Sequence, residues 1–161
     1  WVRGICRHLP YLQGDCMKFR RLLPLAALLV APVVSAQSTS CPTLPSSASL
    51  SWERVDGRDF TYCKAIRDAD GSQSFAVMLR ADTQFRTRRS QREGDRVLID
   101  GREVFWYRGD VVSGIVRETL IELDRNSTAH IVVRAESDAE LLESIRIAQG
   151  LRFQDVRLGS N

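Results

Sequence analysis

The chain has 161 residues, of which 23 are Lys or Arg and 20 are Asp or Glu, so its formal net charge is +3. This length corresponds to one ordinary domain. The sequence contains neither a glycine-rich phosphate loop nor a dinucleotide-binding fingerprint, so no motif points to a cofactor, and we expect none.

The stretch from Met17 to Ala36 has the three parts of a secretory signal peptide. A basic start is followed by an apolar run, Leu22 to Val34, and then by small residues. The run contains two prolines and is shorter than the roughly 20 apolar residues of a spanning helix. We therefore predict cleavage after Ala36 rather than an uncleaved anchor. Residues 1–16 are interpreted as an over-extended leader, with a genuine N-terminal extension as the alternative.

Cleavage changes the charge of the protein. Loss of residues 1–36 leaves 125 residues with 18 basic and 19 acidic side chains, a net charge of −1. The basicity of the whole chain therefore belongs largely to the removed segment and does not predict nucleic-acid binding. No second apolar stretch reaches membrane length, so no stable membrane anchor is expected after cleavage. The short signal is typical of bacteria, and we expect a periplasmic or secreted protein.

Two cysteines remain after cleavage, Cys41 and Cys63. They are predicted to form a disulfide because exported proteins meet an oxidising environment. A zinc site would need four ligands, and only His130 could join the two thiols, so we assign no metal. A free reactive thiol, intermolecular pairing and lipidation of Cys41 are the weaker alternatives.

The first predicted elements are an arm and a hairpin. Residues 37–49 are rich in Ser, Thr and Pro and are predicted to be a flexible N-terminal arm, tied by Cys41 to the strand that holds Cys63. Apolar residues alternate in 58–68 and again in 72–80. The intervening Asp-Ala-Asp-Gly has turn composition, so these two runs predict a β-hairpin.

Two further hairpins follow. Asp100-Gly101 stands between alternating apolar runs, the strongest local hairpin signal in the chain. A two-residue loop there places four side chains on one face, namely Val97, Ile99, Val104 and Trp106. Residues 113–124 and 128–135 are predicted to form the third hairpin. Whether the intervening residues 82–94 form a helix or a loop stays open, because Phe85 is their only sizeable apolar side chain.

The C-terminal part has the pattern of a helix. Ser137 and Glu140 form a capping box, and Gly150 is suited to the helix end. The apolar residues with helical spacing are expected to pack on the sheet, namely Leu141, Leu142, Ile145 and Ala148. A short last strand with Leu151 and Phe153 inward would follow. The predicted fold is α+β: one domain, residues 50–158, with an antiparallel sheet of about six or seven strands and one C-terminal helix packed on a face.

The candidates for catalysis are weak. His130 is the one histidine after residue 36, and strand alternation places it on the face opposite Ile131. A nucleophile and an orienting acid would have to meet it in space for catalysis, and we interpret it as an ordinary sheet residue. Close carboxylate pairs are unavoidable among 19 acids and mostly adjoin arginines, which favours surface ion pairs. We assign no catalytic residue.

One cluster of basic residues has the composition of an anion-binding site. Five arginines lie within eleven residues, at Arg86, Arg88, Arg89, Arg92 and Arg96. Guanidinium groups bind phosphate and carboxylate through paired hydrogen bonds. The first four of these arginines are the candidate anion-binding residues, and a solvated polar connector is the competing interpretation. The consecutive aromatic residues at 105–107 are expected mainly to pack in the core, with a binding surface as the alternative.

The sequence thus favours an exported, non-enzymatic domain with a binding or structural role in the bacterial envelope. An interaction module for anionic envelope components, acting through residues 86–96, is the second hypothesis. A small hydrolase is the third. The candidate partners are an anionic envelope polymer and another envelope protein.

Overall fold

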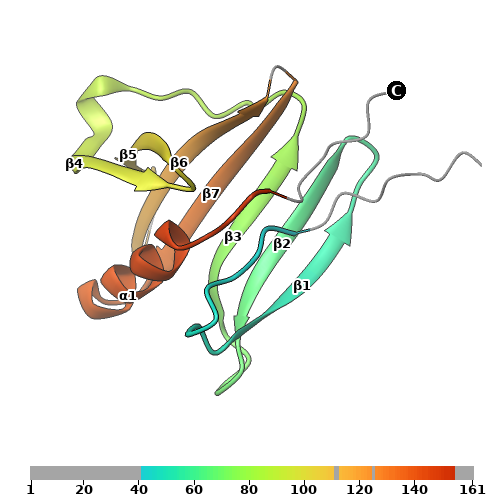
Figure 1. Cartoon of the computed structure of the whole chain (residues 1–161). Helices are drawn as coiled ribbons and strands as arrows, with labels where there is room; N and C mark the ends of the chain where they lie inside the picture. Colours follow the sequence, from blue (N-terminus) through green and yellow to red (C-terminus); the bar gives the residue numbers. More distant parts are fainter. Residues whose placement is uncertain (1–40, 111–112, 125, 155–161) are drawn as a thin grey trace, which may run out of the picture. The chain divides into compact units, whose positions relative to one another are not determined.

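A computed structural model describes residues 41–110, 113–124 and 126–154 of the chain. The predicted leader and signal peptide, residues 37–40 of the predicted arm and residues 155–158 lie outside this part. The described residues form one antiparallel sheet of seven strands and a single C-terminal helix, so the predicted α+β fold is confirmed. The strand order is β1-β2-β3-β7-β6-β5-β4 (Figure 1).

The elements follow the predicted order, with one additional strand at the start. Each strand pairs with its neighbour in the sequence except where β3 pairs with β7. The strands are β1 (Leu50–Asp56), β2 (Phe60–Arg67), β3 (Gln73–Arg80), β4 (Arg92–Ile99), β5 (Arg102–Arg108), β6 (Ile115–Asp124) and β7 (Ser127–Ala135). A short 3₁₀ turn, η1 (Arg89–Gln91), precedes β4, and the helix is α1 (Asp138–Gln149).

The predicted turn between β4 and β5 is present in the predicted register. Ile99 pairs with Arg102, and the two turn residues have positive φ angles, +50° at Asp100 and +76° at Gly101. Two successive left-handed residues give the type I′ turn that suits the right-handed twist of a hairpin. The side chains of Ile99 and Trp106 are buried on the same side, as the alternation predicts.

The face of the sheet that α1 covers holds the hydrophobic core. Its fully buried side chains come from the central strands and include Phe75, Val77, Leu79, Ile121, Ile131 and Val133. The helix packs against β7, β4 and β3. The β4–β5 hairpin therefore curves towards the helix, out of the line of the other strands (Figure 1).

The buried stripe of α1 differs from the predicted one. Leu141 and Ala148 are buried as expected and Ile145 packs against the core, but Leu142 is 67% exposed, so its predicted burial is wrong. Ser144 takes the inward position instead, and its Oγ lies 2.8 Å from Oγ of Ser74 on β3. A buried hydroxyl pair satisfies both polar groups. A pattern of apolar residues alone cannot predict this contact.

The helix ends are capped close to the prediction. Ser137 Oγ accepts a hydrogen bond from the Glu140 N–H at 3.3 Å, which is the first half of the capping box. The Glu140 carboxylate accepts from the N–H of Glu136, one residue before the expected Ser137. Gly150 follows the helix, and a Cβ there would lie 2.5 Å from Cγ of Pro45. This close approach, rather than a left-handed conformation, requires glycine.

The predicted disulfide joins Cys41 to Cys63 on β2, with the two Cα atoms 5.8 Å apart. The residues after Cys41 are not a free arm. Pro42 is fully buried, and its carbonyl accepts a hydrogen bond from Trp52 Nε1 at 2.8 Å. Thr43 pairs with Arg152 in an isolated bridge, which replaces the predicted last strand. The inward positions predicted for Leu151 and Phe153 are confirmed, with 0% and 4% of each residue exposed.

Candidate functional site

The connector between β3 and β4, residues 81–91, crosses β7 and β6 on the face opposite the helix (Figure 1). Its first half is held by three contacts. Thr83 is buried, and its Oγ1 accepts a hydrogen bond from the N–H of Phe85 at 3.1 Å. The Phe85 ring stacks on His130 of β7 at a centroid distance of 4.6 Å, and its edge meets Tyr107 at 5.9 Å. These contacts hold Phe85 against β7 and β5, directly before the first of the clustered arginines.

His130 lies on the face opposite Ile131, as strand alternation predicts. Its Nε2 is 2.7 Å from Oε2 of Glu118 on the neighbouring strand β6, and both side chains are half-buried. The ring is thus held between a carboxylate and the Phe85 ring. A catalytic base would bond to a hydroxyl or thiol nucleophile, whereas His130 Nε2 bonds to a carboxylate. We therefore interpret the His130–Glu118 pair as a structural contact that holds the connector through Phe85.

The arginine segment, residues 86–96, is neither a helix nor a simple loop. It is extended up to Arg88, makes the η1 turn and then becomes strand β4 at Arg92. The helix that the sequence left open for residues 82–94 is therefore absent. The physical reason is that this stretch has no apolar stripe to hold a helix, whereas Arg92 can continue the pairing with Tyr107 of β5.

Two acidic side chains at this segment, Glu93 and Glu103, are paired with arginines other than the four candidates. Glu93 lies 3.5 Å from both Arg108 and Arg117, and Glu103 lies 2.6 Å from Arg96. Within the described ranges, no carboxylate lies within 4.0 Å of the four candidate anion-binding guanidiniums, namely those of Arg86, Arg88, Arg89 and Arg92. All four side chains are exposed, so an incoming anion can reach them.

Two of these arginines have non-ionic contacts that position them. Arg86 Nη1 donates to the carbonyl of Thr83 at 2.9 Å. The guanidinium carbon of Arg92 lies 4.1 Å from the ring centroid of Phe105, and that of Arg96 lies 5.4 Å from the same centroid. Cation–π contacts orient a guanidinium without neutralising its charge. The half-buried Phe105 therefore lies beneath two guanidiniums of the segment, whereas Trp106 and Tyr107 are buried, as expected for core residues.

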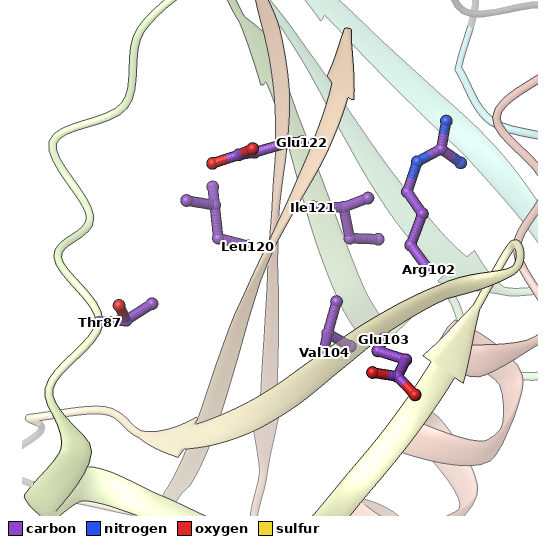
Figure 2. A pocket seen from close by; sticks show the side chains of 7 residues that line it. All are labelled: Thr87, Arg102, Glu103, Val104, Leu120, Ile121 and Glu122. Carbon is purple, nitrogen blue, oxygen red and sulfur yellow. The ribbon is translucent and has the colours of Figure 1, made fainter.

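A cleft of about 520 Å³ adjoins the arginine segment (Figure 2). The connector forms one side of it through Thr87, whose side chain points towards Leu120 and Val104. Strands β5 and β6 form the other sides, and the lining residues are Thr87, Arg102, Glu103, Val104, Leu120, Ile121 and Glu122. We refer to this space as the β5–β6 cleft. Its volume is in the range of ligand-binding pockets.

The sequence did not predict this cleft. Its residues have an ordinary strand pattern, and no composition signal shows that two neighbouring strands in a sheet separate. The arginines beside it were predicted as a candidate site, but Phe105 beneath them and Phe85 before them were not assigned this positioning role. The one sequence signal for this arrangement was the isolated Phe85 directly before the run of arginines that begins at Arg86.

The comparisons give no family for the chain: no known protein family, curated protein or solved structure matches it. Among the described residues, none of the helices is both long and apolar enough to cross a membrane. The same residues contain no group of three or more His, Cys, Asp or Glu side chains placed to hold a metal ion. The disulfide is consistent with an oxidising, extracellular environment.

Proposed function

We propose that this protein is an exported, non-enzymatic binding domain that holds an anionic polymer of the bacterial envelope through its arginine segment. The observation that carries the proposal is the separation of charges. Glu93 and Glu103 pair with arginines outside the candidate set, and among the described residues the four exposed candidate guanidiniums have no carboxylate within 4.0 Å. Phosphate and carboxylate groups are the anions that guanidinium recognises best.

Export supports this choice of partner. The three-part signal ending at Ala36 and the disulfide both favour the periplasm or the cell exterior. The anions available there are phosphorylated lipids, lipopolysaccharide and acidic glycans. A net charge of −1 after cleavage would by itself disfavour binding to a polyanion, so any such binding has to come from a local patch.

Chromatography on lipopolysaccharide and phosphocellulose columns tests the proposal. The triple variant Arg88→Ser/Arg89→Ser/Arg92→Ser should elute at clearly lower salt than the parent protein. The matched control is Arg58→Ser/Arg134→Ser/Arg146→Ser, which removes three exposed guanidiniums that also have no carboxylate within 4.0 Å among the described residues. Both variants lower the net charge by three.

The control should elute close to the parent if the segment is the binding site. Equal losses in the two variants would show that only net charge matters, and equal retention of all three proteins would show that the segment does not bind. Unfolding midpoints of each variant establish that the fold is intact. Arg88→Lys/Arg89→Lys adds a further comparison, because it preserves charge but removes the planar guanidinium.

A further inference from the structure

A second hollow lies where the beginning of β3 meets the end of β7. Its volume is about 540 Å³, which is in the range of ligand-binding pockets. Val132 and Arg134 line it from β7, on the sheet face that also carries His130. Strand β2, the chain after β7 and the first turn of α1 contribute further lining residues, namely Tyr62, Glu136 and Glu140. We refer to this space as the β3–β7 groove.

An irregularity in strand β3 leaves space beside Arg134. The register between β2 and β3 shifts at this point, and Ser74 falls between the paired residues Gln73 and Phe75. Continuing the β3–β7 register places Ser74 opposite Arg134. The Ser74 side chain, however, is buried and meets Ser144 of the helix at 2.8 Å. Because the bulge directs this side chain to the helix side, a gap remains next to Arg134 on the other face of the sheet.

The end of the groove next to α1 is held by Arg67. Its Nη2 lies 3.0 Å from Oε1 of Glu140, and its Nη1 donates to Ser72 Oγ at 3.0 Å. The second carboxylate oxygen of Glu140 accepts from the N–H of Glu136 at 2.9 Å. The side chains of Arg67 and Glu140 are only 20% and 29% exposed. The charge of Glu140 is thus already neutralised, and the wall that it forms is fixed before any ligand arrives.

Arg134 and Glu136 are the two charges of the groove that a ligand can still reach. Both residues are exposed, and among the described residues neither has an oppositely charged group within 4.0 Å. They therefore do not pair with each other, although they are only two positions apart. Backbone positions two residues apart in an extended chain are separated by about 7 Å and carry side chains on the same face. The groove thus presents one cation and one anion at this spacing.

We propose that the β3–β7 groove binds a short neutral peptide with free termini, a dipeptide of apolar residues. Arg134 holds the terminal carboxylate through paired hydrogen bonds, and Glu136 holds the terminal ammonium. An extended dipeptide spans about 7 Å, whereas a single amino acid spans about half of this distance. The half-buried Tyr62 and Val132 provide apolar surface for its side chains.

Charge also excludes other ligands from the groove. Because the free charges of Arg134 and Glu136 are opposite, an ion of either sign meets repulsion from one of them, and a zwitterion does not. Polyphosphate is therefore disfavoured here, although it suits the arginine segment. This inference goes beyond the proposed function, since the groove uses none of the residues of that segment.

The probe is the dipeptide Ala-Val, and the readout is the shift of the Val132 and Arg134 amide signals during an NMR titration of the purified protein. N-acetyl-Ala-Val lacks the ammonium, and Ala-Val-amide lacks the carboxylate. Each should bind about tenfold or more weakly than Ala-Val, because each loses a charge-assisted contact. Equal affinities of the three compounds, or no saturable shift with Ala-Val, would overturn the proposal.

Variants assign each terminus to its residue. Arg134→Gln should bind Ala-Val as weakly as the parent binds Ala-Val-amide, and Glu136→Gln should bind it as weakly as the parent binds N-acetyl-Ala-Val. The matched control is Arg146→Gln, which removes an exposed guanidinium of α1 that does not line the groove. It should bind Ala-Val as the parent does. Variants at Arg134 and Glu136 that keep the affinity of the parent, with an unchanged unfolding midpoint, would contradict this binding mode.

The same measurements separate the groove from the proposed function. The Arg88→Ser/Arg89→Ser/Arg92→Ser variant should bind Ala-Val with the affinity of the parent, whatever its retention on phosphocellulose. Arg134→Gln should lose Ala-Val binding and elute from phosphocellulose close to the parent. Loss of Ala-Val binding in the triple variant would place the peptide at the arginine segment and overturn its assignment to the groove.

Discussion

The ring of Phe85 lies on the imidazole of His130, with centroids 4.6 Å apart and an angle of 15° between the planes. This contact joins the connector to β7, and Glu118 holds His130 from the neighbouring strand at 2.7 Å. The arginine segment begins at the next residue, Arg86. The stack therefore helps to position the first part of the candidate binding surface, and the pairing of β4 with β5 positions Arg92.

Replacing Phe85 by Ala should release the connector. We expect faster amide hydrogen exchange in residues 84–91 and elution from phosphocellulose at lower salt, because ordering the free segment costs conformational entropy on binding. The loss of a half-buried ring should reduce the free energy of unfolding by about 1–2 kcal/mol. Phe85→Trp is the control, since it preserves a stacking ring. Unchanged exchange in Phe85→Ala would show that the stack does not hold the connector.

Two adjacent leucines of α1 should respond very differently to truncation. Leu141 is buried and Leu142 is 67% exposed. Leu141→Ala should lower the free energy of unfolding by about 2–4 kcal/mol through lost burial and a residual cavity. Leu142→Ala should change it by less than about 0.5 kcal/mol. Urea unfolding of both variants measures the difference, and a larger loss at Leu142 would mean that the helix is rotated from its described position.

The disulfide should contribute strongly to stability. It closes a loop between positions separated by 22 residues, for which the chain-entropy account gives about 3 kcal/mol. Cys41→Ala/Cys63→Ala should therefore unfold at lower denaturant than the oxidised parent. The parent measured under reducing conditions should match the double variant. An unfolding midpoint that does not respond to reductant would contradict this assignment.

Acid should destabilise the turns between strands. Hydrogen bonds from Ser72 Oγ and Ser72 N–H lower the pKa of Asp70 below its ordinary value of 3.8. The N–H of Asn126 does the same for the pKa of Asp124 in the β6–β7 turn. The unfolded chain then binds protons at higher pH than the folded one. The stabilisation is present above the ordinary pKa and is lost as the pH falls through the lowered value.

Urea unfolding of Asp70→Asn tests this pH dependence. The variant should be less stable than the parent at neutral pH, and the difference should shrink as the pH falls through the lowered pKa of Asp70, where the parent carboxyl is protonated as well. Asp68→Asn, in the same turn, is the matched control and should show less of this effect, since no hydrogen bond to its side chain is described. A pH-independent difference between Asp70→Asn and the parent would contradict the prediction.

The parts of the fold that the sequence predicted are those with local causes. The Asp100-Gly101 turn, the Ser137 cap and the pairing of the two cysteines each follow from one or two residue types. The burial of Leu142 was predicted from spacing and is wrong, because Ser144 finds a hydroxyl partner on β3. Contacts between residues far apart in the chain decide such details.

The candidate site shows the same limit. The cluster of arginines is visible in the sequence, but their freedom from carboxylates depends on which acids other strands bring to them, as Arg117 does for Glu93. Strands β5 and β6 pair at only two positions, Tyr107–Glu118 and Arg108–Arg117. Alternating strand patterns predict pairing and do not predict where pairing stops.

The most direct test of the central claim is an NMR titration of the parent protein with inorganic polyphosphate, followed through the Nε–Hε signals of its arginines. The account predicts that the largest shifts occur at Arg86, Arg88, Arg89 and Arg92. They should weaken steeply as salt rises, because exposed charges are screened over about 8 Å at physiological ionic strength. Shifts of equal size at the scattered Arg58, Arg134 and Arg146, or no shifts at low salt, would contradict an anion-binding role for the arginine segment.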